Sequence, residues 1–116
     1  MNTTDLTPEE RAFLDQASEV LQWMVSRVRP GRPIGLNTTW SRGTTIFPEL
    51  FRLDGEAPRA AWDLHGTSPF EAGMVFVVAP TIVSESFGRI TLEQTVRVTA
   101  SQPEILTATP QISWEH

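Results

Sequence analysis

The chain has 116 residues, of which 40% are hydrophobic and 20% charged, and its formal net charge is −5 at pH 7. This size and composition predict one globular domain over residues 1–116 and argue against disorder. All nine basic residues are arginine, so the acidic chain offers few cations to a phosphate backbone, and we expect no nucleic-acid partner. The chain has no cysteine, which excludes disulfides and thiolate metal sites.

The sequence shows no sign of membrane insertion or secretion. Its longest apolar run, residues 74–80, is too short to span a bilayer, and no basic, apolar and small-residue pattern of a secretory signal opens it. We therefore expect no membrane association and, by default, a cytoplasmic location.

Residues 7–28 have the pattern of one long amphipathic helix. Thr7 and Glu10 match a capping box, and Pro8 suits the first helical position. Pro30 and the residues that follow it prevent continuation. The helical spacing predicts one buried face, made of Phe13, Ala17, Val20, Leu21, Met24 and Val28.

Three further apolar residues of this helix lie off the predicted face: Leu14, Trp23 and Val25. Either the buried stripe is wide or these residues face a partner. An exposed tryptophan is a common interface anchor, so Trp23 is a candidate interface residue.

After the helix, the hydrophobic period changes to two, which is typical of half-buried strands. Residues 74–79 are apolar on both faces, which indicates a central strand that Pro80 ends. The predicted strands cover 34–40, 60–65, 74–79, 81–87, 89–99 and 105–114, the last with an edge or bulge at Pro110. We predict an α+β fold, in which one long N-terminal helix packs across a curved, mostly antiparallel sheet of about five to six strands.

Residues 44–53 have too many large apolar side chains for a strand with one buried face. Pro48 interrupts the segment, which predicts an edge strand, a bulge or a short helix. At least one of Phe47 and Phe51 should therefore be substantially exposed. With Glu49 and Arg52 as a polar rim, the two phenylalanines form a candidate protein interface.

Residues with catalytic chemistry are few. Asp63 and His65 share one face of a predicted strand, where the carboxylate could orient the imidazole as a general base, or the two could be an ordinary polar pair in solvent. Gln94 interrupts the apolar face of residues 89–99 and either contacts a ligand in a cavity under the helix or bonds to backbone or water. We expect no cofactor, and we expect no metal because His65 is the only internal histidine.

Four tryptophans and six phenylalanines in a small acidic chain without catalytic motifs favour a protein-binding surface. The predicted function is a non-enzymatic protein-interaction module that binds a protein partner or a second copy. It would be a small acidic inhibitor or immunity-type protein, or a component of a larger assembly such as a phage particle. The alternative is a ligand-binding or enzymatic domain with Asp63, His65 and Gln94 in a cavity between helix and sheet. A closed pocket would favour the alternative, and a filled core with an apolar outer patch would favour the first.

Overall fold

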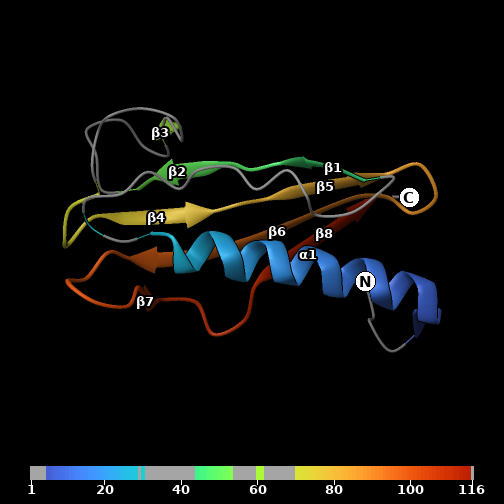
Figure 1. The fold of residues 1–116 in the computed structure, drawn as a ribbon, viewed down its shortest axis with the longest axis horizontal. Helices are drawn as coiled ribbons and strands as arrows, with labels where there is room; N and C mark the ends of the chain where they lie inside the picture. The colour runs from blue at the N-terminus through green and yellow to red at the C-terminus, as the bar shows by residue number, and fades with distance from the viewer. Residues whose placement is uncertain (1–4, 29, 31–43, 54–59, 62–69, 116) are drawn as a thin grey trace.

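The computed structural model describes residues 5–28, 30, 44–53, 60–61 (backbone only) and 70–115. These residues form one helix, α1 (Pro8–Ser26), and eight strand segments in one sheet (Figure 1). Every pairing between the segments is antiparallel. The segments are β1 (Thr44–Phe47), β2 (Leu50–Arg52), β3 (Ala60–Ala61), β4 (Val75–Val78), β5 (Thr81–Ser84), β6 (Gly88–Arg97), β7 (Glu104–Ile105) and β8 (Gln111–Glu115).

The start of α1 is fixed by the predicted capping box. The Glu10 N–H donates to the Thr7 hydroxyl (3.1 Å), and the Thr7 N–H donates to the Glu10 carboxylate (3.0 Å). At the other end, the Arg27 N–H donates to the Met24 carbonyl (3.0 Å) and the Val28 N–H donates to the Val25 carbonyl (3.1 Å). The helix therefore lies within the predicted range.

Two pairs of segments are parts of longer strands interrupted by proline. The β1–β5 and β2–β4 pairings share one register, which places Pro48 opposite Pro80. The ladder continues across this point, because the Ala79 N–H donates to the Glu49 carbonyl (2.9 Å) and the Leu92 N–H to the Pro80 carbonyl (3.1 Å). Pro80 thus separates β4 from β5, as predicted, but the register is the same on both sides of it, since a proline removes one N–H donor without changing the direction of the chain.

The ten-residue β6 is the continuous strand around which the sheet is built. β4 and β5 pair along one side of it, and β7 and β8 along the other. Six residues separate Ile105 from Ile112, but only three separate their partners Val96 and Leu92. The chain therefore bulges between β7 and β8, where the sequence predicted a bulge or an edge at Pro110.

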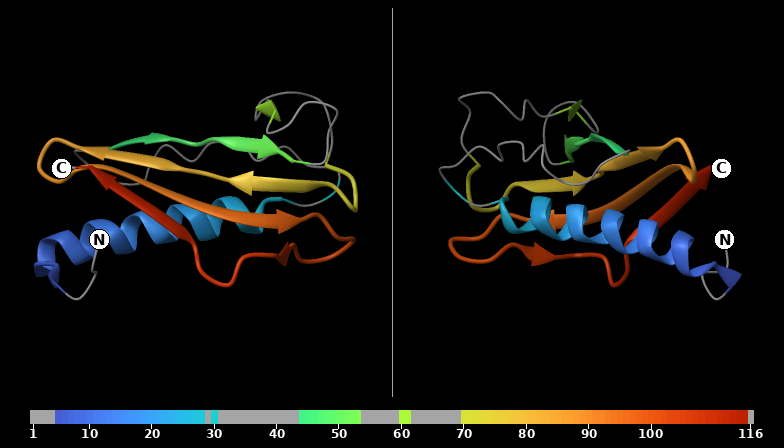
Figure 2. Two further views of the ribbon diagram at one scale, coloured as in Figure 1. Left: turned by 180° about the vertical axis from the view of Figure 1, so that it is seen from behind. Right: turned by 45° about the vertical axis from the view of Figure 1, so that its right-hand side comes forward.

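The eight segments follow five strand paths, namely β1 with β2, β3, β4 with β5, β6, and β7 with β8. The predicted α+β class and antiparallel sheet are thus confirmed. The predicted curvature is not found, because the sheet is open and extends beside α1 without curling around it (Figures 1 and 2).

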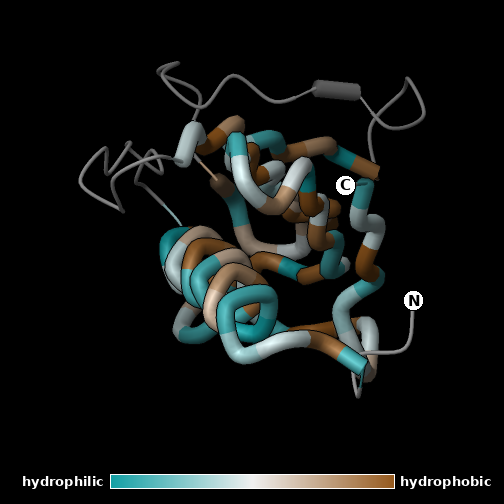
Figure 3. The backbone as a smooth tube through the Cα atoms, turned by 90° about the vertical axis from the view of Figure 1, so that its right-hand side faces the viewer, coloured by the Kyte–Doolittle hydropathy of each residue, from teal (hydrophilic) through white to brown (hydrophobic). Residues whose placement is uncertain are grey.

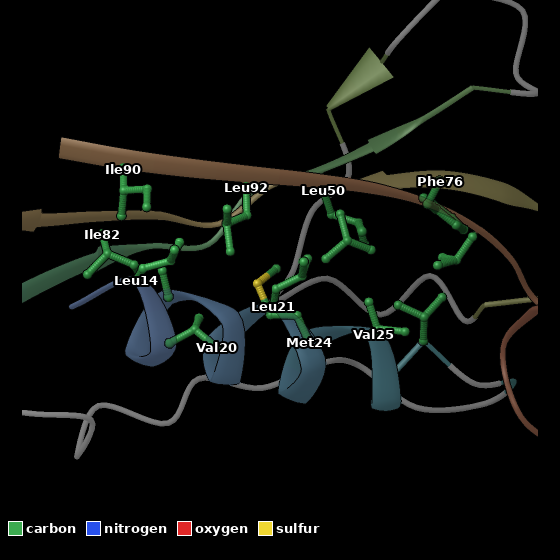
Figure 4. Close-up of a cluster of buried hydrophobic side chains, with 14 of the residues drawn as sticks. Leu14, Val20, Leu21, Met24, Val25, Leu50, Phe76, Ile82, Ile90 and Leu92 are labelled. Atoms are coloured by element: carbon green, nitrogen blue, oxygen red, sulfur yellow. The ribbon is translucent and has the colours of Figure 1, made fainter. Parts of the chain in front are cut away.

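The core lies between α1 and one face of the sheet. Hydrophobic stretches of the helix and strands face each other in the end-on view of Figure 3. Figure 4 shows Leu21 and Met24 of the helix pointing toward side chains of the sheet, such as Leu92 and Leu50. Leu14 and Val25 are also buried, so the helical stripe is wide. The buried cluster comprises Phe13, Leu14, Ala17, Val20, Leu21, Met24, Val25, Val28, Leu50, Phe70, Phe76, Val78, Ile82, Ile90, Leu92, Val96 and Val98.

The predicted strand at 34–40 lies outside the described residues, as does most of the one at 60–65. In the ranges that the structure describes, no helix has the length and apolar character needed to cross a bilayer.

Candidate functional site

The space beneath α1 is filled with apolar side chains from the helix and from four strands (Figure 4). Within the described ranges, every buried side-chain nitrogen or oxygen atom has a hydrogen-bond partner. The space between α1 and the sheet is therefore a packed core. The alternative function requires a polar cavity of ligand size at this place.

Among the residues that the structure describes, Phe47 is the large aromatic side chain that is exposed. Its neighbour Ile46 pairs with Ile82 and packs against the core, so Phe47 points to the opposite face of the sheet, which we call the outer face. Phe47 is 48% exposed. Since β1 pairs with β5 alone among the described strands, it is an edge strand there, and an aromatic at its end has few neighbours. The predicted exposure of at least one phenylalanine in this segment is confirmed.

The other predicted interface residues are split between the two faces of the sheet. Leu50 is buried in the core, so Phe51 and Glu49 alternate to the outer face with Phe47, whereas Arg52 alternates to the helix side. Phe51 is only half-buried although β3 and β4 flank it, and Glu49 is exposed. Of the two residues predicted to form the polar rim, Glu49 therefore lies on the same face as Phe47, and Arg52 lies on the opposite face.

Trp23 is half-buried and packs against the core. The Arg27 guanidinium lies 5.4 Å from the centre of its ring, one helical turn away. This cation–π contact and the core packing leave only part of the indole for a partner.

Gln94 lies in a groove that opens beside α1. The groove has a volume of about 340 Å³ and lies between the C-terminal half of α1, the middle of β6 and the chain around β7. Several residues that line it are exposed, so the groove is open to solvent, and the lining residues carry no titratable group. We call it the glutamine groove; its lining is Gln22, Val25, Ser26, Gln94, Gln102, Pro103 and Ile105.

A second exposed apolar surface, which the sequence did not predict, runs along β7 and β8. Its members are Ile105, Leu106 and Ile112, which are 53%, 40% and 42% exposed, and we call them the apolar edge. The alternation in residues 105–114 predicts that Leu106 and Ile112 share one face of a strand. Leu106 keeps a ladder bond to the Thr95 carbonyl (2.8 Å) and lies opposite Thr95, on the outer face of the sheet. Ile112 pairs with the buried Leu92 on the helix side, where α1 leaves it partly uncovered. Pro110 was the available signal, because it indicated an edge strand.

Asp63 and His65 lie outside the described residues, so their predicted pairing has no structural counterpart. Among residues 5–28, 30, 44–53 and 70–115, no group of three histidine or carboxylate side chains is placed to hold a metal ion.

Comparisons with known proteins give no relative for this chain: no protein-family model, no curated protein and no solved structure matches it.

Proposed function

We propose that this chain is a non-enzymatic protein-interaction module whose contact surface includes Phe47. The observation that carries the proposal is the position of this side chain, which is about half exposed and lies outside the packed core. An aromatic side chain supplies a large apolar area at low entropic cost, and such residues dominate binding energies at interfaces.

The exposed Glu49 is the polar neighbour of Phe47 on the outer face, and the chain as a whole is acidic. The negative charge of this chain favours binding to a basic surface on its partner, because complementary charges speed the encounter and select the partner. This combination supports a small acidic inhibitor or immunity-type protein, or a component of a larger assembly such as a phage particle.

The test first isolates a protein partner from the native host by its binding to the wild-type chain. It then compares the affinities of the variants for that partner. Phe47→Ala should weaken binding by about 2 kcal/mol, roughly 30-fold in Kd, with little change in thermal stability. Phe51→Ala should have a smaller effect on binding, because Phe51 is flanked by strands on both sides and less of its ring is open to a partner.

The matched control is Thr45→Ala, which changes an exposed residue on the same strand and the same face without removing an aromatic ring. Wild-type affinity is expected for this variant. If both phenylalanine variants bind like wild type, the surface lies elsewhere, and the half-buried Trp23 is the next residue to replace.

The glutamine groove supports a second candidate function, the binding of a small neutral ligand. Three primary amides, on Gln22, Gln94 and Gln102, line an opening of about 340 Å³, and each can donate and accept hydrogen bonds. In the experiment above, Gln94→Ala should leave protein binding intact. Loss of biological activity in Gln94→Ala but not in Phe47→Ala would favour the ligand-binding function, for which Asp63 and His65 remain catalytic candidates.

A further inference from the structure

Gln94 is a partly buried amide in a row of apolar side chains. It pairs with the buried Val78 of β4, and the residues two before and two after it on β6, Leu92 and Val96, are buried in the core. Gln94 therefore lies on the helix side of the sheet. A polar group in such a row loses solvation, and hydrogen bonds are needed to offset that loss.

The bulge between β7 and β8 keeps Gln94 accessible from solvent. In the described part of the chain, β7 pairs with β6 as far as Val96, and β8 pairs with β6 as far as Glu93, so neither strand pairs with Gln94. The C-terminal half of α1 and the chain that leads into β7 form the walls at this end of the molecule (Figure 1). The resulting glutamine groove, of about 340 Å³, has the volume of a site for a small ligand.

The amides in the groove have hydrogen-bonding groups that the fold does not use. Elsewhere on α1, the partly buried Gln16 donates from its amide to the Thr44 hydroxyl (3.1 Å). Within the residues that the structure describes, the side-chain amides of Gln22, Gln94 and Gln102 make no such bond. Each amide carries both N–H donors and a carbonyl acceptor. The groove therefore offers donors and acceptors together.

The electrostatics of the groove favour an uncharged ligand. Among its lining residues, all of which the structure describes, none is titratable, so an ion would find no counterion there. The negative end of the α1 dipole lies beside Val25 and Ser26, which further disfavours an anion. The Ser26 hydroxyl already donates to the Trp23 carbonyl (2.6 Å), so the remaining side-chain donors are those of the amides. Val25, Pro103 and Ile105 add apolar surface.

We propose that the glutamine groove binds an uncharged ligand that presents a carboxamide on an apolar body. A carboxamide carries an N–H donor and a carbonyl acceptor on one carbon atom, so it can pair with a glutamine amide through parallel hydrogen bonds. The apolar body then lies against Val25, Pro103 and Ile105. This inference rests on the second candidate function, ligand binding in the groove, and names the class of the ligand.

A set of aromatic probes with equal numbers of heavy atoms tests the class. Benzamide presents a donor and an acceptor, acetophenone an acceptor alone, benzoate a negative charge, and benzamidine a positive charge with donors alone. Each probe is titrated to about 50 mM and binding is followed by NMR of the protein amides. Benzamide should bind with a Kd on the order of 1 mM. The other probes should bind roughly tenfold more weakly, because each leaves an amide group unpaired or brings an uncompensated charge.

The side-chain amide signals report where the probe binds. Benzamide should shift the signals of Gln22, Gln94 and Gln102. The signals of Gln16 and Gln111 should stay in place, because neither residue lines the groove.

Variants of Gln94 separate ligand binding from folding. Gln94→Leu extends the apolar row of β6, so it should melt at or above the wild-type temperature and bind benzamide roughly tenfold more weakly. Gln94→Glu should prefer benzamidine to benzamide, because a carboxylate then lines the groove. The matched control is Gln111→Leu, which replaces an exposed glutamine of β8 outside the groove. It should bind benzamide like wild type.

A pair of blocked peptides distinguishes the sources of the carboxamide. Roughly tenfold tighter binding of acetyl-Ala-Gln-Ala-amide than of acetyl-Ala-Ala-Ala-amide would support a glutamine side chain of a peptide as the ligand. Equal binding of the peptides, with benzamide still preferred among the aromatic probes, would support a small molecule. Either result keeps the carboxamide as the group that the groove recognises.

The remaining outcomes overturn the inference. Equal binding of benzamide and acetophenone, or tighter binding of benzoate or benzamidine, disproves the carboxamide class but keeps a ligand in the groove. A Gln94→Leu variant that binds benzamide like wild type, or shifts confined to Gln16 and Gln111, disproves the groove as the place of binding. If no probe binds up to about 50 mM, the inference and the second candidate function fail together. Protein binding through Phe47 is then unaffected.

Discussion

Leu21 shows most clearly how one residue supports the fold. It lies in the centre of the buried face of α1 and is 2% exposed, among core neighbours that are all apolar. Leu21→Asp would bury a carboxylate without a cation, at a cost of several kcal/mol, against a total stability of about 5–15 kcal/mol for a small domain. We expect this variant to be unfolded at room temperature by circular dichroism. Gln22→Asp, which adds the same charge at the exposed next position, should melt like wild type; a cooperative wild-type-like melt of Leu21→Asp would contradict the assignment of the face.

At the residue scale, the sequence identified the apolar residues whose burial was uncertain, but it did not predict which of them are buried and which are exposed. Helical spacing locates the centre of the stripe near Leu21, but its width depends on how much of the sheet lies beneath the helix, which is why Leu14 and Val25 could not be placed. The pattern also predicted that Phe47 and Phe51 cannot both be buried. Which of them is more exposed depends on strand neighbours, and among the described strands Phe51 has one on each side whereas Phe47 has one on a single side.

At the scale of elements, the helix start is the feature that local sequence determines almost completely. Thr7, Pro8 and Glu10 act within one turn, so no distant contact is needed to predict their hydrogen bonds. Thr7→Ala removes the cap and should cost about 1 kcal/mol, which lowers the melting temperature by several degrees in calorimetry. Thr109→Ala, the same change at an exposed position of the β7–β8 bulge, should leave it unchanged. An equal loss of stability in both variants would show that the cap contributes nothing specific.

The strands were harder to predict because their ends depend on pairing. Pro80 separates β4 from β5, as the sequence predicted, and Pro48 separates β1 from β2, yet the register of the ladder is the same on both sides of each proline. In an antiparallel ladder only every second residue directs its N–H toward a given neighbour, so one proline removes one bond. Local sequence shows the missing donor, but not the strand that lies opposite.

At the scale of the whole molecule, the sequence predicted the class of fold and part of the candidate surface. The long helix, the antiparallel sheet and an exposed phenylalanine follow from periodicity and from counting apolar residues. The glutamine groove and the apolar edge do not, because Gln22, Gln94 and Gln102 are brought together by packing between α1, β6 and the chain near β7. The openness of the sheet likewise depends on how α1 sits against it, which no local pattern encodes.

The continuity of β6 has a consequence for how the native state opens. Pro48, Pro80 and the β7–β8 bulge interrupt the neighbouring strands, so β6 and α1 carry most of the connection between the two ends of the sheet. Cooperative units of a protein open at different free energies, and elements with few partners open first. In amide hydrogen exchange, the Leu92 N–H at the centre of β6 should exchange only by global unfolding. The Leu106 N–H, bonded to the Thr95 carbonyl (2.8 Å) beside the two-residue β7, should exchange much faster through local opening. Equal protection of the two amides would mean that the sheet opens as one unit.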